Sequence, residues 1–156
     1  MIPAAEPIFI DTNILVYANV ASAPFHVEAL TAVLEYWKNG NTVWVSRQVL
    51  REFLVVITRP QLFSSPSSGL IAASRARFFE QNFSIANETA QVTFHLLQLI
   101  ESLDIKGKQV HDSNIVATML ANRVRYLLTH NVADFKRFSH LIEVIPLIGN
   151  SSSDNT

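Results

Sequence analysis

The sequence predicts an α/β domain, a three-layer sandwich in which helices flank a central parallel sheet of four to five strands. Short segments rich in β-branched and aromatic residues alternate with longer amphipathic segments, and no internal repeat interrupts this alternation. At 156 residues and 49% hydrophobic content, the chain is long enough to bury one core. We therefore expect one domain over residues 1–148, followed by a polar, disordered tail over residues 149–156.

The individual elements follow from apolar spacing and from the residues that begin or end each segment. Strands are predicted, from β-branched and aromatic content, at about 8–10, 42–45, 83–85, 125–129 and 142–145. Helices are predicted, from apolar residues at helical spacing, at about 23–38, 46–58, 70–81, 89–103 and 111–123. Pro24 suits the start of the first helix, and Ser46 suits the cap of the second, which ends before Pro60.

Composition excludes several classes of site. The chain has no cysteine, which rules out disulfides, thiolate zinc sites and cysteine nucleophiles, and fits a reducing cytoplasm. We expect a cytoplasmic protein with no membrane partner, because no apolar run approaches the ~18 residues of a membrane span and no secretory signal is evident. The net charge of the chain is −1. The rest of the chain is net positive, however, once four acids that are described next are set aside. The basic residues then expected to meet phosphates are Arg47, Arg51, Arg59, Lys106 and Lys108.

Those four acids lie where strands give way to loops or helices. Asp11 directly follows the strand 8–10, and Glu52, Asp112 and Asp134 each follow or open a similar element. The carboxyl edge of a parallel sheet is where ligands bind in open α/β folds. Carboxylates that converge on one edge repel one another unless a cation lies between them, so the pattern predicts a metal site.

Helical geometry indicates which of these acids point inward. At ~100° per residue, Asp112 falls in the middle of an apolar face, with Asn114 and Thr118 on the opposite side. Burying an isolated ionised carboxylate there would be costly. Glu52 lies only at the edge of a buried stripe, and Asp134 follows the strand 125–129 across a four-residue loop.

Each acid also has a structural interpretation that the sequence leaves open. Asp11 could form an Asx turn, and Asp112 could simply cap its helix. Glu52 could extend into solvent from the edge of its stripe. Asp134 could cap a short helix over residues 135–138, and we expect Glu88, a glutamate away from any strand end, to be a solvated or capping residue.

Four motifs in order resemble the PIN domain family, and within it the VapC-type toxins of bacterial toxin–antitoxin pairs. They are Asp11-Thr12-Asn13, residues 46–53 around Glu52, His111-Asp112-Ser113, and residues 128–135 around Asp134. The successive acids are 41, 60 and 22 residues apart, as in the acidic quartet of that family. The resemblance spans roughly residues 7–147, whereas the tail matches nothing.

The resemblance implies a metal-dependent endoribonuclease with Mg²⁺ or Mn²⁺ in the site, and oxygen ligands without His or Cys favour these ions. Asp11 and Asp112 would be the most direct ligands, with Glu52 and Asp134 completing the catalytic, acidic pocket. The supporting or substrate-binding residues would be Thr12, Asn13, Ser46, Thr129 and Asn131. The expected partners are an RNA substrate, a small antitoxin protein and a second copy of the chain.

Three other readings compete with this one. A metal-free ribonuclease would need two imidazoles, but we expect His111 and His130 to be ordinary exposed residues. A haloacid-dehalogenase-like phosphatase needs a second Asp where this chain has Asn13. The remaining alternative is a catalytically silent PIN-like module that binds RNA or protein without cutting.

Overall fold

Five parallel strands form the centre of the molecule in the computed structural model, which describes residues 2–60 and 66–148. Their order across the sheet is β3-β2-β1-β4-β5. The strands are β1 (Ile8–Ile10), β2 (Val43–Ser46), β3 (Ser84–Ala86), β4 (Tyr126–Thr129) and β5 (Glu143–Pro146). The predicted parallel sheet of four to five strands is therefore confirmed. The predicted tail, residues 149–156, lies outside the described residues, and the boundary at residue 148 stays a prediction.

Six α-helices and one 3₁₀-helix connect these strands within the described ranges. They are α1 (Thr12–Asn19), α2 (His26–Lys38), α3 (Arg47–Thr58), α4 (Gly69–Asn82), α5 (Ala90–Leu103), α6 (Gln109–Ala121) and the 3₁₀-helix η1 (Val132–Phe138). Five of them match the predicted helices to within a few residues. Helix α1 was not predicted, because its buried residues Ile14, Leu15 and Val16 are consecutive and show no helical spacing.

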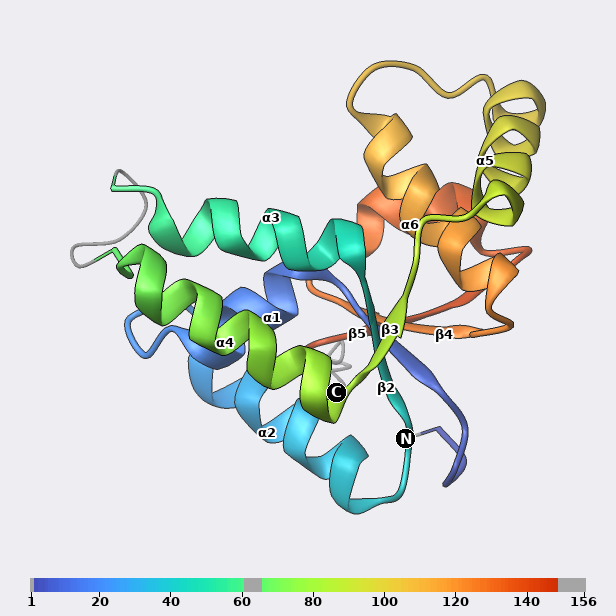
Figure 1. Cartoon of the computed structure of the whole chain (residues 1–156). Helices are drawn as coiled ribbons and strands as arrows, with labels where there is room; N and C mark the ends of the chain where they lie inside the picture. The colour runs from blue at the N-terminus through green and yellow to red at the C-terminus, as the bar shows by residue number, and fades with distance from the viewer. Residues whose placement is uncertain (1, 61–65, 149–156) are drawn as a thin grey trace, which may run out of the picture.

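The helices form two layers, one on each side of the sheet (Figure 1). Strand order runs one way from β1 through β2 to β3 and then returns past β1 to β4. Because parallel crossovers are right-handed, the helices of the outward connections and those of the return connection must cover opposite faces. Accordingly α1, α2, α3 and α4 pack together on one side, and α5 packs with α6 on the other.

The core follows from this layering. The central strand β1 is completely buried, with Ile8, Phe9 and Ile10 all inaccessible to solvent, as expected for a strand covered on both faces. Helix α6 is buried around most of its circumference because it packs against both α5 and η1. The prediction that Thr118 lies on its exposed side is therefore wrong: Thr118 is buried, and its hydroxyl donates to the carbonyl of Asn114. No helix in the described part of the chain has the length and apolar character needed to cross a membrane.

Candidate functional site

The carboxyl ends of β1 and β4 meet at the centre of the sheet. This is the point where the strand order reverses, which is the usual ligand-binding position in open α/β sheets. The register pairs Ile10 with Leu128, and the backbone N–H of Asp11 donates to the carbonyl of Leu128 over 3.0 Å. Asp11, just after β1, and Thr129, the last residue of β4, are consequently neighbours although 118 residues separate them.

Asp11 is a buried carboxylate held by three hydrogen bonds. Its Oδ1 accepts from the backbone N–H of Thr12 (2.8 Å), and its Oδ2 accepts from the Thr129 hydroxyl (2.7 Å) and the Asn13 amide (3.2 Å). Only 7% of the residue is exposed. Burial raises the pKa of Asp11 to about 6, although the hydrogen bonds from Thr129, Thr12 and Asn13 oppose that rise. The Asx interpretation and the functional one are compatible, since the bond from Thr12 caps α1.

Glu52 is fixed by partners on two different helices. The Thr12 hydroxyl on α1 donates to its Oε2 (2.7 Å), and the Gln48 amide on α3 donates to its Oε1 (2.8 Å). Thr12 therefore holds two acids at once, Asp11 through its backbone N–H and Glu52 through its side chain. The interpretation of Glu52 as a freely solvated surface residue is wrong, because it is half-buried and both its oxygens accept hydrogen bonds.

Asp112 and Asp134 complete the acidic group without such anchors. Burial raises the pKa of Asp112 to about 6, and the negative charges of Asp11, Asp134 and Glu52 add to that rise. Among the described residues, none donates a hydrogen bond to the carboxylate of Asp112 or Asp134. The helix-capping interpretations are wrong for both, because Lys108 and Asn131 occupy the N-cap positions of α6 and η1.

All four acids line one pocket of about 310 Å³. Its other lining residues are Thr12, Asn13, Val16, Tyr17, Val56 and Asn131. The pocket lining thus includes apolar as well as acidic side chains. A larger cavity of about 730 Å³ lies where α5, α6 and the segment before β5 meet, and it includes none of the four acids.

The predicted supporting residues divide into three kinds. Thr12, Asn13 and Asn131 line the pocket, and the buried Thr129 lies behind Asp11. The Thr129 hydroxyl, besides donating to Asp11, accepts from the backbone N–H of Asn131 (3.0 Å). Ser46 is separate: it is buried, it is not among the pocket-lining residues, and its hydroxyl accepts from the Val49 N–H (3.1 Å) as the cap of α3.

Sequence reasoning missed a buried polar chain that continues from Glu52. Gln48, only 3% exposed, donates to Glu52 and to the His111 carbonyl (2.9 Å), and its Oε1 accepts from the Asn114 amide (2.8 Å). Asn114 also donates to Glu88 (3.1 Å), so Glu88 does take part in a polar contact. The available signal was spacing, because Gln48 precedes Glu52 by four residues on the same helix.

The two histidines beside the acids differ. His111 is exposed, as predicted. The prediction for His130 is wrong, because it is half-buried and its ring lies 4.5 Å from that of Phe25 and 5.7 Å from that of Tyr17, centroid to centroid. The His130 ring is therefore packed against the rings of Phe25 and Tyr17.

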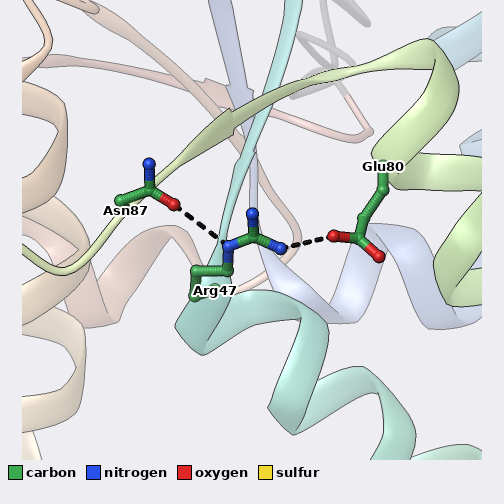
Figure 2. A network of polar contacts seen from close by, with 3 residues as sticks. All are labelled: Arg47, Glu80 and Asn87. Carbon is green, nitrogen blue, oxygen red and sulfur yellow. Dashed lines mark hydrogen bonds and ion pairs between the residues drawn. The ribbon is translucent and has the colours of Figure 1, made fainter.

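Arg47 does not face the acidic pocket. One of its Nη atoms pairs with Glu80 of α4, and its Nε donates to Asn87, which follows β3 (Figure 2). The prediction that Arg47 is available for phosphates is therefore wrong, because both contacts direct its guanidinium elsewhere. Lys106 likewise forms an ion pair with Asp104 (3.0 Å).

The carboxylate, hydroxyl and amide oxygens of the pocket lining are the kind of ligand that a hard divalent cation takes. No three acids or histidines in the described ranges lie close enough together to form a ready set of metal ligands. Mg²⁺, however, commonly binds through only one or two carboxylates and keeps several waters. A cation would also relieve the repulsion that the other three carboxylates impose on Asp112.

Comparisons with known proteins agree with this geometry. The family model described as "PIN domain" matches residues 8–141. Ribonuclease VapC24 of Mycobacterium tuberculosis is 29% identical over 130 residues, which cover 83% of this chain and 89% of that protein. Ribonuclease VapC48 of the same organism is 24% identical over 130 residues, covering 82% of this chain and 89% of the relative.

Among solved structures, this chain is similar to VapBC2 from Rickettsia felis, which was crystallised bound to a DNA fragment from its promoter. The TM-score is 0.67 and the sequence identity is 24%, with 90% of this chain and 98% of the other covered. At that identity the likeness establishes a shared fold.

Proposed function

This chain belongs to the PIN domain family, and on that premise we propose that it is a metal-dependent endoribonuclease, the toxin of a VapBC-type toxin–antitoxin pair. One observation carries the proposal: the four acids come from four separate segments of the chain and line a single pocket. The names of its relatives, ribonucleases VapC24 and VapC48, support the same activity. The substrate class is therefore RNA, and the reaction is hydrolysis of a phosphodiester bond.

The proposed roles follow from the contacts of each residue. Asp11 and Asp112 would hold a Mg²⁺ or Mn²⁺ ion, and Glu52 and Asp134 would complete the acidic pocket around it. Such an ion lowers the pKa of water and stabilises charge that develops on the scissile phosphate. Thr12 and Thr129 keep the Asp11 carboxylate in one orientation, through bonds of 2.8 and 2.7 Å.

The amides of the pocket have a separate proposed role. Asn13 and Asn131 line the same pocket as the acids, and an amide N–H₂ group can donate to a phosphate oxygen. Asn13 is itself held in place, since its Oδ1 accepts from the His130 N–H (3.2 Å). The Asn13 amide N–H₂ group donates to Asp11 (3.2 Å) and to the Thr129 hydroxyl (3.3 Å), so Asn13 supports the acid. We expect Asn131 to position the phosphate while the acids supply negative charge for the cation.

The alternative is a PIN-like module that binds RNA or protein without cutting. Retention of all four acids in one pocket favours catalysis, because a binding module gains nothing from four carboxylates that repel phosphate. The two functions differ in one measurable respect. Only the nuclease converts RNA to shorter products in the presence of a divalent cation.

Two protein partners belong to this proposal, an antitoxin and a second copy of the chain. Support for a partner surface comes from helix α2, where Val27, Leu30, Leu34 and Trp37 are all exposed. Their spacing of three, four and three residues forms a continuous apolar stripe along one helix face. If the stripe pairs with its counterpart in a second copy, Leu34→Glu will convert a dimer to a monomer in light-scattering measurements of mass.

The experiment that tests the activity is cleavage of a panel of structured RNAs and single-stranded DNA. The panel is run with Mg²⁺, with Mn²⁺ and with EDTA, using Asp11→Ala as the inactive variant. We expect RNA cleavage that requires the cation and is lost in the variant. RNA cleavage that persists in EDTA, or equal cleavage by Asp11→Ala, would contradict the proposed mechanism.

A further inference from the structure

Three aromatic rings lie together beside the acidic pocket. They belong to Tyr17 of α1, Phe25 just before α2, and His130 just after β4, and we call them the aromatic trio. The ring centroids are 6.0 Å apart for Tyr17 and Phe25, 5.7 Å for Tyr17 and His130, and 4.5 Å for Phe25 and His130. All three residues are half-buried, so none of them is sealed inside the core.

The trio borders the site through two adjoining pockets. Tyr17 lines the acidic pocket directly. His130 lines a neighbouring pocket of about 480 Å³, which shares Asn131 and Asp134 with the acidic one. Phe25 lies against both rings and is not among the lining residues of either pocket. A ligand bound at the acids would therefore meet Tyr17 within the acidic pocket, and it would meet His130 if it extended into the neighbouring pocket.

The trio is held in place by specific contacts. Phe25 has φ of 59° and ψ of 23°, the left-handed conformation that a bulky side chain rarely adopts. The following residue, His26, donates from Nδ1 to the carbonyl of Tyr17 over 2.6 Å, which ties this loop to α1. The backbone N–H of His130 donates to Asn13. Non-glycine strain of this kind occurs preferentially at functional sites, where the surrounding structure maintains it.

We propose that a nucleobase of single-stranded RNA stacks on Tyr17, with His130, whose ring is inclined at 74° to that of Tyr17, contacting the base edge-on and Phe25 as a positioning residue behind them. The inference rests on the endoribonuclease function proposed above and adds a binding site to it. A cation and amides suffice to bind a phosphate, so the acids do not explain why the pocket lining also includes the side chains of Val16, Tyr17 and Val56. A base attached to the bound phosphate does explain it, since proteins recognise unpaired bases by stacking them on aromatic side chains.

The test compares two probes on one protein. The first probe is a ten-nucleotide single-stranded RNA without self-complementarity, and the second is the same sugar–phosphate backbone without bases. Both are titrated with Mg²⁺ into the full chain carrying Asp112→Asn, which keeps the RNA intact, and the ratio of the two affinities is the readout. Because the probes share their phosphates, the ratio isolates the contribution of the bases.

The matched variants are Tyr17→Ala, Tyr17→Phe and His130→Ala, with Phe94→Ala as the control on a different surface. Phe94 is also aromatic, is 53% exposed on α5 and lines neither pocket. We expect the protein that carries only Asp112→Asn, the parent of these variants, to prefer the intact RNA. Tyr17→Ala should lower that preference by roughly 5- to 150-fold, which corresponds to the free energy of stacking one base. Tyr17→Phe and Phe94→Ala should leave the ratio within about twofold, and His130→Ala should lower it.

The outcomes separate this inference from the function beneath it. A ratio that stays the same in Tyr17→Ala and His130→Ala, while RNA still binds or is cleaved, overturns the stacking site alone and assigns the trio to loop packing or to a protein partner. If neither the Asp112→Asn chain nor the wild-type chain binds either probe, both the stacking site and the proposal that RNA is the substrate are overturned. If Tyr17→Ala does not fold, the ratio in His130→Ala and the preference of the parent protein decide the question.

Discussion

The two halves of the acidic pocket are built differently. In one half, three hydrogen bonds hold Asp11 and two hold Glu52, and the donors themselves come from α1, α3 and β4. In the other half, no residue of the described ranges donates to the carboxylates of Asp112 or Asp134. The structure therefore fixes one pair of acids firmly and leaves the other pair to be positioned by electrostatics.

This difference indicates how the site is completed. Asp11 has its raised pKa mainly from burial, whereas Asp112 also feels the negative charge of three other acids. A divalent cation would bind the anchored half as it stands and would draw in the unanchored half by removing its repulsion. We expect the anchored acids, Asp11 and Glu52, to control the geometry of the metal site. We expect the unanchored acids, Asp112 and Asp134, to be stabilised most when the metal binds.

The largest expected effect comes from Asp112→Asn, which removes a charge from the unanchored half. RNA cleavage should fall by about three orders of magnitude or more, because an interaction with the cation is lost. Without metal at pH 7.5, however, the free energy of unfolding should rise by roughly 1 kcal/mol after allowance for solvent screening, since a repelled carboxylate is gone. Activity assays and thermal melts in EDTA check the two results.

Asp11→Asn provides the contrast to that variant. It should abolish activity as well, but it should stabilise the metal-free protein less than Asp112→Asn does, because the amide NH₂ group would face at least one of the donors that now serve the carboxylate, which offsets the relief of a buried charge. Equal stability changes of the same sign in both variants would contradict the distinction between the two halves.

Thr129→Val tests the anchor of Asp11 without changing charge or shape. The Thr129 hydroxyl is buried and donates over 2.7 Å, so its loss leaves a buried carboxylate oxygen with one donor fewer. We expect metal affinity to fall by roughly 10- to 100-fold and the free energy of unfolding to fall by about 1–3 kcal/mol. Calorimetric titration with Mn²⁺ and denaturant unfolding measure the two effects.

Thr118→Val is the matched control for that substitution. Thr118 is equally buried, but its hydroxyl bonds a carbonyl of its own helix. A loss of metal affinity as large as that of Thr129→Val would mean that general loosening of the fold, rather than the Asp11 anchor, is responsible.

Gln48→Met tests the anchor of Glu52. The substitution keeps the volume of a buried side chain but removes the donor to Glu52 and the acceptor for Asn114. Activity should fall by about tenfold, at the lower end of the range for residues that orient metal ligands. Val55→Met, a change at a residue of the same helix that is 47% exposed and does not line the pocket, should leave activity unaltered. Unchanged kcat and KM in Gln48→Met would show that Glu52 needs no orientation from this side.

The smallest predicted effect is a pH dependence of stability in the metal-free protein. Burial and neighbouring charge raise the pKa of Asp112 from 3.8 to about 6, so the folded chain binds its proton more tightly than the unfolded chain does. The contribution of Asp112 to the free energy of unfolding therefore falls as pH rises from about 4 to about 6, and stays constant above. The difference between Asp112→Asn and the wild type should grow across this window by about 1 kcal/mol.

Urea unfolding in EDTA at pH 4, 5, 6 and 7.5 gives this difference directly. A difference that is constant over the whole range would mean that Asp112 titrates normally and that the other acids do not repel it.

The acids could be predicted from the sequence because their signal is local. A carboxylate directly after an apolar strand, as at Asp11, must lie at the sheet edge whatever the rest of the fold does. Thr129 and Asn131 were expected near these acids from the family resemblance, and the structure places Thr129 against Asp11 and Asn131 in the pocket lining. Local sequence patterns also predicted the five strands and their alternation with helices.

The features that were missed depend on contacts between distant segments. A helical wheel places Asn114 opposite the apolar face of α6, but its amide donates to Gln48 of α3, a contact that a wheel of α6 alone cannot show. Helix α1 was missed because it follows Asp11 without an intervening loop, and its buried residues are consecutive. Ser46 was predicted as both cap and support residue, and its hydrogen bond to Val49 belongs to the first role.

The most direct test of this account is the binding of Mn²⁺ at pH 7.5, measured by electron paramagnetic resonance on the wild-type chain, Asp11→Asn and Asp112→Asn. Glu101→Gln, which removes an exposed acid of α5 outside the pocket, is the control. We predict that the wild type and the control bind Mn²⁺ alike and that each aspartate variant binds at least about tenfold more weakly. Failure of the wild type to bind Mn²⁺ at millimolar concentration, or equal binding by all four proteins, would contradict a metal site formed by the two halves of this pocket.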